Sequence, residues 1–151
     1  MHAVLFLLLV LSACPLHDAP ARAAQAASRP DRAEHTEAAA FWRDFRGAAL
    51  SDDIARVMQL TSFPFSTAGE LDDDPVAKHG RAAFPALFIR LLRQRERPGP
   101  GISITMRELI RQTPVLGARH FNGVEEHFHV GAFYFGREGG RWRLLEAYLA
   151  E

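Results

Sequence analysis

The spacing of apolar positions divides the chain into a helical part followed by a strand-rich part. From residue 38 to residue 58 the apolar residues recur every three or four positions, which is the period of a buried helix face. This spacing predicts one helix with Thr36 as its N-cap and a second helix that opens at Ser51-Asp52-Asp53. The second helix should end at 61–64, because a proline disfavours helix at the residue before it.

A third helix and a set of strands follow. Phe84 to Leu92 has apolar residues at helical spacing, Pro85 suits the first turn, and Pro98-Gly99-Pro100-Gly101 should end the helix. Residues 102–106 then alternate as a half-buried strand. Residues 124–136 and 141–149 predict two long strands that form an antiparallel hairpin. Helices before strands predict an α+β fold, with the helices packed on one face of an antiparallel sheet.

The N-terminus has the pattern of a secretory leader. Residues 3–11 are nine apolar residues, which is too short to span a bilayer and the right length for a signal sequence. The next residues, Leu11-Ser12-Ala13-Cys14, resemble the lipobox of bacterial lipoproteins. The resemblance implies that residues 1–13 are removed and that Cys14 carries acyl chains such as palmitate, which anchor the protein to a membrane. Pro15 in place of Asp then implies the outer membrane, facing the periplasm. Plain secretion and an unmodified Cys14 are the alternatives.

The residues after the cysteine differ in composition from the rest of the chain. Residues 15–34 contain seven alanines, three prolines and a single large aliphatic residue, Leu16. Such a segment buries too little apolar surface to offset the entropy of ordering it. We therefore expect a disordered tether at 14–34 and a folded domain at 35–151. An alanine-rich helical stretch at 21–28 is the alternative for part of the tether.

Four features of the domain together resemble a known superfamily. They are an aromatic first helix at 41–45, the opening of the second helix at 51–53, the step Phe63-Pro64-Phe65, and a closing hairpin that ends at 142–148. Residues 38–149 are thereby similar to the NTF2-like (SnoaL, ketosteroid-isomerase-like, cystatin-like) superfamily. The resemblance implies a cone in which a curved antiparallel sheet wraps round helices, with a pocket between them.

The histidines are the main candidates for chemistry. Strand alternation places His127 and His129 on one face, and His127, His129, Phe133 and Tyr134 form our candidate pocket. The alternation leaves open which side chains line the pocket: the histidines, or Phe128, Val130 and Tyr134. His120 and Glu125 could complete a zinc site, but we expect solvated side chains, no metal and no cofactor. No residues match the carboxylate base and oxyanion donors of a ketosteroid isomerase.

Charge gives the remaining expectations. Acidic and basic residues balance at 18 each, which disfavours a nucleic-acid partner. Residues 44–74 carry an acidic excess, and residues 81–119 carry an arginine excess. Arg90, Arg93 and Arg97 should lie on one helical face, which is either a solvated surface or a site for an anionic partner.

Together these patterns predict a lipid-anchored envelope protein that binds a small apolar ligand or an envelope protein without catalysis. The alternative is a ketosteroid-isomerase or cyclase type of enzyme that uses His127, His129 or Tyr134. The oligomeric state, monomer or dimer, is left open.

Overall fold

The structure is a computed structural model that describes residues 19–69, 75–121 and 126–149, with their side chains from His35 onward. Cys14 and the rest of the lipobox lie outside these residues, as does Glu125. The elements, in chain order, are α1 (Ala19–Leu50), α2 (Ile54–Gln59), β1 (Thr61–Ala68), β2 (Ala77–His79), α3 (Phe84–Arg93), β3 (Arg95–Gly99), β4 (Ile102–Thr105), α4 (Met106–Gln112), a 3₁₀ turn (Ala118–His120), β5 (His127–Val130), β6 (Phe133–Glu138) and β7 (Arg141–Tyr148).

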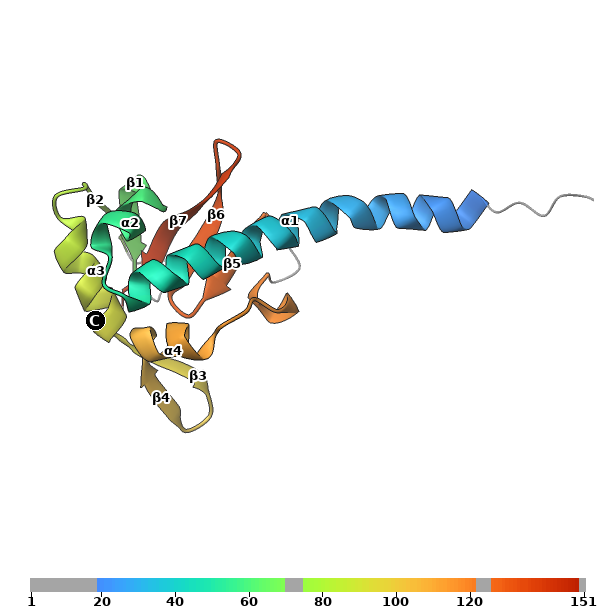
Figure 1. The fold of residues 1–151 in the computed structure, drawn as a ribbon. Coiled ribbons are helices and arrows are strands. Elements are labelled where there is room, and N and C mark those ends of the chain that lie inside the picture. The colour runs from blue at the N-terminus through green and yellow to red at the C-terminus, as the bar shows by residue number, and fades with distance from the viewer. Residues whose placement is uncertain (1–18, 70–74, 122–125, 150–151) are drawn as a thin grey trace, which may run out of the picture.

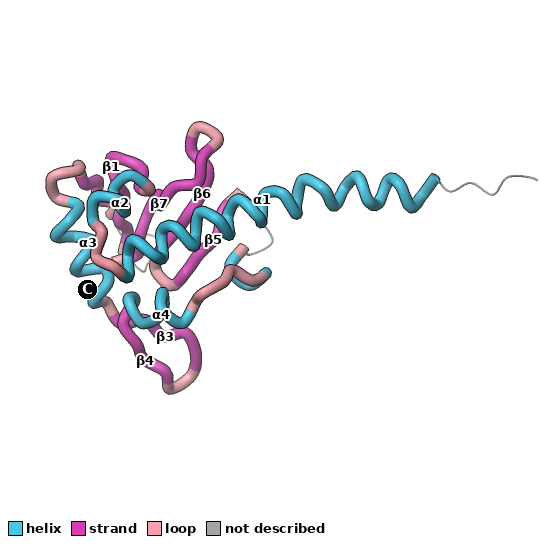
Figure 2. The backbone as a smooth tube through the Cα atoms, viewed as in Figure 1, coloured by secondary structure: helices cyan, strands magenta, loops and turns pink. Residues whose placement is uncertain are grey.

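Helix α1 is longer than the sequence predicts. It begins at Ala19, so residues 19–34 are helical where we expected a disordered tether, and Thr36 lies inside the helix instead of capping it. Pro30 does not interrupt the helix. Figures 1 and 2 show the first half of α1 extending away from the body of the protein, while its second half crosses the sheet. In the described part of the chain, no helix is both long and apolar enough to cross a membrane.

The five-stranded sheet has the order β2-β1-β7-β6-β5. Three of its pairings are antiparallel, but β1 and β7 run parallel, so the expectation of a purely antiparallel sheet is wrong at this pair. The pairing is parallel because β1 enters the sheet from α2, and Leu60 at the end of that helix accepts a hydrogen bond from Leu144 of β7. Register shifts in β1–β7 and β6–β7 accompany the curvature of the sheet. Helices with a curved sheet confirm the α+β class.

The long strand predicted at 124–136 is two strands. The chain turns at Gly131, which has φ +52°, and β6 returns antiparallel to β5. A two-residue turn reverses the alternation of side chains, so Phe128, Val130, Phe133 and Phe135 are all buried on one face. The predicted hairpin of 124–136 with 141–149 holds only for its second half, where β6 pairs with β7 across the turn at Gly139-Gly140.

Aromatic side chains fill the space between the helices and this face of the sheet. Trp42 and Phe45 of α1 lie 5.8 Å and 5.0 Å from Phe135, measured between ring centroids. Phe88 of α3 stacks on Phe133 at 5.8 Å. All five residues are almost completely buried. The interior is therefore packed with rings, each of which contributes about 2 to 3 kcal/mol by burial.

The starts of α2 and α3 follow the sequence. Asp53 caps α2 by accepting a hydrogen bond from the Arg56 amide, and Pro85 lies in the first turn of α3, as predicted. Helix α3 ends at Arg93, before 98–101; residues 98–99 belong to β3, and 100–101 form the turn of the β3–β4 hairpin. The strand predicted at 102–106 stops at Thr105, which caps α4, a helix that the sequence analysis did not predict.

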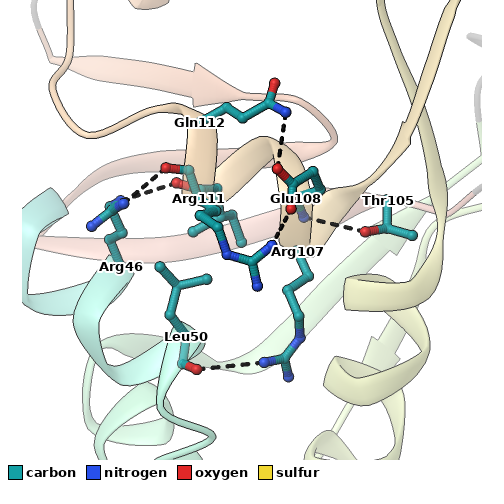
Figure 3. Close-up of polar contacts among 8 residues, drawn as sticks. Arg46, Leu50, Thr105, Arg107, Glu108, Arg111 and Gln112 are labelled. Carbon is teal, nitrogen blue, oxygen red and sulfur yellow. Dashed lines mark hydrogen bonds and ion pairs between the residues drawn. The ribbon is translucent and has the colours of Figure 1, made fainter.

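Helices α1 and α4 each donate an arginine hydrogen bond to the C-terminal end of the other (Figure 3). The guanidinium of Arg46 donates hydrogen bonds to the carbonyls of Ile110 and Arg111 at 3.0 and 2.8 Å. In return, Arg107 donates to the Leu50 carbonyl at 3.5 Å. The Ile110 carbonyl also accepts a hydrogen bond from the Thr113 amide at 3.3 Å. All three carbonyls lie in the last turn of their helices, where intrahelical donors run out, so each arginine adds hydrogen bonds to the end of the other helix.

Candidate functional site

The residues of the predicted pocket lie on two faces of the sheet. His127, His129 and Tyr134 are half-buried together on the face turned away from the aromatic core, and Phe133 is fully buried on the opposite face. The ring of Tyr134 lies 4.7 Å from that of His129 and 5.4 Å from that of His127. Phe133 therefore belongs to the core and not to a site with the histidines. Both patterns considered above assumed one strand through residues 124–136. Neither pattern holds, because the turn at Gly131 divides this segment into β5 and β6.

Burial sets the protonation of this face. It lowers the pKa of His129, and the neighbouring His127 lowers it further. Burial also raises the pKa of Tyr134, with additional contributions from Glu146 and Tyr148. Both side chains are thus favoured in their neutral forms at pH 7. They can exchange hydrogen bonds with a partner that lies on this half-exposed face.

The metal alternative finds no support among the residues that the structure describes. Within them, no group of three His, Cys, Asp or Glu side chains is placed to hold an ion. His120 is buried in the 3₁₀ turn, where the Gly117 amide donates to its Nδ1 at 2.8 Å. Its pKa is lowered by burial; a hydrogen bond from Nδ1 to the Gly117 carbonyl, at 3.0 Å, opposes this effect, and Arg119 reinforces it.

The predicted arginine face is divided between two elements. Arg90 and Arg93 are exposed in α3, whereas Arg97 is exposed in β3. The prediction of one helical face is therefore wrong for Arg97, because the helix ends at Arg93 and the chain continues as a strand. Arg90 and Arg93 remain as a pair on the solvent side of α3.

A cleft of about 470 Å³ opens between α1, α2 and the turn that joins β6 to β7. Figure 1 shows α2 beside the C-terminal end of α1 and the β6–β7 turn at the top of the view. The volume lies within the range of about 300–1,000 Å³ that is typical of small-molecule sites. The cleft is lined by Glu37, Phe41, Arg56, Gln59, Leu60 and residues 140–143.

Local structure explains how these side chains meet. Glu37 and Phe41 are four residues apart and therefore share one face of α1. The positive φ angles of Gly139 and Gly140 allow the tight turn that presents Arg141, Trp142 and Arg143. Trp142 is 6% exposed and forms the apolar floor together with Phe41.

Several charged groups of the cleft are already paired. Arg56 forms an ion pair with Asp44, and Arg137, which lies behind the cleft, forms one with Glu37. Arg143 donates to the carbonyl of Gln59. Within the described residues, neither Arg141 nor Arg143 has a carboxylate within ion-pair distance. The cleft therefore presents two guanidinium groups without a counter-charge.

Two buried N–H groups next to the cleft also lack an acceptor among the described residues. They are Nε1 of Trp142 and Nε of Arg137. The Arg137 guanidinium lies 5.5 Å from the centre of the Trp142 ring, within the range of a cation–π contact. Both atoms are shielded from solvent, so neither faces the open cleft.

The sequence analysis did not identify this cleft. Its residues come from three segments, at 37–41, 56–60 and 140–143, which are brought together only by the tertiary fold. The one local signal is the alternation Arg141-Trp142-Arg143 directly after two glycines. It indicates an aromatic residue between two cations at a hairpin turn, but not what faces it.

Comparisons with protein-family models, with curated proteins and with solved structures give no match. Function is therefore inferred from the residues of this chain alone.

Proposed function

We propose that this protein is a lipid-anchored envelope protein whose α+β domain binds a ligand without catalysing a reaction. The site is the cleft between α1, α2 and the β6–β7 turn, and the observation that carries the proposal is the composition of that cleft. Aromatic surface and a few polar groups in a concave site are typical of ligand binding. The pocket that the NTF2-like resemblance implies lies between the sheet and the helices, a space that aromatic rings fill in this protein, so the cleft carries the proposal by itself.

Binding fits the cleft better than acid–base catalysis does. Its lining includes no histidine, and Glu37, its carboxylate, is held by Arg137. A general base needs a free carboxylate or imidazole within reach of the substrate. The enzyme alternative relies on His127, His129 and Tyr134, none of which lines this cleft.

A neutral fluorescent probe, N-phenyl-1-naphthylamine, tests ligand binding. We expect saturable binding to the folded protein at one site, and at least about tenfold weaker binding to Gln59→Trp, because the larger ring occupies the cleft. Gln112→Trp, at an exposed position of α4, is the matched control and should bind like the original protein. Thermal melting of both variants checks that they fold. Absent saturation, or equal binding by Gln59→Trp, would contradict the proposal.

The lipid anchor requires a separate test in cells. Cys14→Ala removes the thiol that the lipobox resemblance assigns to acylation. We expect the variant to remain unprocessed at residue 13 and to carry no labelled palmitate. In globomycin-treated cells the original protein should also remain unprocessed but should keep the label, because globomycin blocks the peptidase and not the acylation. Unchanged processing and unchanged membrane fractionation in both cases would refute lipidation and leave ligand binding as a separate question.

A further inference from the structure

We infer that the ligand of the cleft is an anionic amphiphile: an apolar chain or ring that ends in a carboxylate, sulfonate or phosphate. This inference rests on the proposed binding function and specifies the chemical class of the ligand. Two features of the cleft support it: the arginines that have no carboxylate partner among the described residues, and the aromatic floor.

The charges favour an anion. The lining contains three arginines and one carboxylate, and both Glu37 and the nearby Asp44 are already paired with arginines. Glu138 stands opposite Arg141 in the hairpin, but its carboxylate accepts hydrogen bonds from the Ser62 hydroxyl at 2.7 and 2.8 Å. Arg141 has no hydrogen bond or ion pair with the residues that the structure describes. An oxyanion in the cleft would provide the missing counter-charge.

The arginine side chains favour the same chemistry. Guanidinium groups bind carboxylate and phosphate in a planar, two-pronged geometry, and bonds to a charged oxygen are stronger than bonds to a neutral one. Arg141 and Arg143 supply such donors to the cleft, whereas its carboxylate, Glu37, is already paired with Arg137.

The apolar surface defines the other half of the ligand. Phe41, Leu60 and Trp142 line the cleft beside the arginines. Inorganic phosphate or sulfate would leave these side chains uncovered, whereas an aliphatic or aromatic group would bury them. A molecule with both parts uses the whole cleft.

Two probes with the same ring system separate charge from shape. 8-Anilinonaphthalene-1-sulfonate carries a sulfonate, and N-phenyl-1-naphthylamine does not. At low salt we expect the sulfonate probe to bind at least about tenfold more tightly than the neutral probe. This preference should shrink as NaCl is added, because salt screens the charge of the arginines. In Arg141→Gln the ratio of the two affinities should fall toward one. Arg90→Gln, an exposed arginine on α3, is the matched control and should keep the original ratio.

Competition shows which anionic amphiphile fits. Decanoate and vesicles that contain phosphatidylglycerol should displace the sulfonate probe, whereas decanol and phosphatidylcholine vesicles should not. Displacement by decanoate identifies a free amphiphile, and displacement by the anionic vesicles alone identifies a lipid headgroup.

Equal affinity for the two probes, or equal displacement by charged and neutral competitors, would overturn the inference. The proposed binding function would still stand if the neutral probe bound to the original protein and bound more weakly to Gln59→Trp. Failure of both probes to bind would refute the proposed function as well.

Discussion

Gly131 is subject to two independent constraints. Its φ of +52° is unfavourable for any residue with a side chain, and a Cβ atom there would lie 2.6 Å from Leu109 Cδ2 and 2.9 Å from Met106 Sδ. We predict that Gly131→Ala lowers the free energy of unfolding by about 2 to 4 kcal/mol, as the sum of backbone strain and overpacking. Urea denaturation measures the change.

Gly139 supplies the control for this substitution. Its φ is +57°, but no atom lies within 4 Å of an added Cβ. Gly139→Ala should therefore cost only the backbone strain, about 1 kcal/mol. Equal losses in the two variants would mean that the packing of α4 against the β5–β6 turn does not constrain Gly131.

At the scale of the elements, the reciprocal contacts between α1 and α4 give a second prediction. Arg46→Leu keeps most of the aliphatic stem but removes the hydrogen bonds to the Ile110 and Arg111 carbonyls. We expect a loss of about 1 to 3 kcal/mol in the free energy of unfolding, since the Arg111 carbonyl would lose this donor and the Ile110 carbonyl would keep only the Thr113 amide. Arg43→Leu, at an exposed position of the same helix, should change it by less than about 0.5 kcal/mol. If Arg46→Leu lowered the free energy of unfolding by as little as Arg43→Leu, water would be replacing the hydrogen bonds of the arginine.

The elements that the sequence predicted correctly are those with local signals. Asp53 caps α2, Pro85 marks the start of α3, and the glycines after Glu138 mark the last hairpin. Helix α4 was missed because alternation at 102–106 runs directly into it. Its signal is present as Thr105 followed three residues later by Glu108, the pattern of a capping box.

The candidate site was harder to predict than the elements. A one-position error at the turn of Gly131 moves every later side chain to the other face, which is why Phe133 was placed with His129. The cleft depends on contacts between residues about 100 positions apart, such as Arg137 with Glu37. Residue spacing carries no information about such contacts.

For the whole molecule, two histidines link stability to pH. The pKa values of His129 and His120 are lowered mainly by burial. In the unfolded chain each has a pKa near about 6.5, so the unfolded state binds protons first as the pH falls. We predict that the free energy of unfolding is lower at about pH 5.5 than at about pH 7.5, and that His129→Gln reduces this difference.

Urea denaturation at both pH values measures the effect. His35→Gln, at an exposed position on α1, is the control and should leave the pH difference close to that of the original protein. If His129→Gln also left it unchanged, burial on the sheet would not be what disfavours the charged imidazole.

The position of β7 has a consequence for how the molecule is assembled. This strand lies in the middle of the sheet, yet it follows every other described strand along the chain. A partly synthesised chain that ends at residue 140 can pair β1 with β2 and β5 with β6. It lacks β7, the strand that joins these two pairs into one sheet. Isolated two-stranded pieces are barely stable in water. During synthesis or export the domain should therefore stay open and protease-sensitive until residues 141–148 arrive, and then close in a single step.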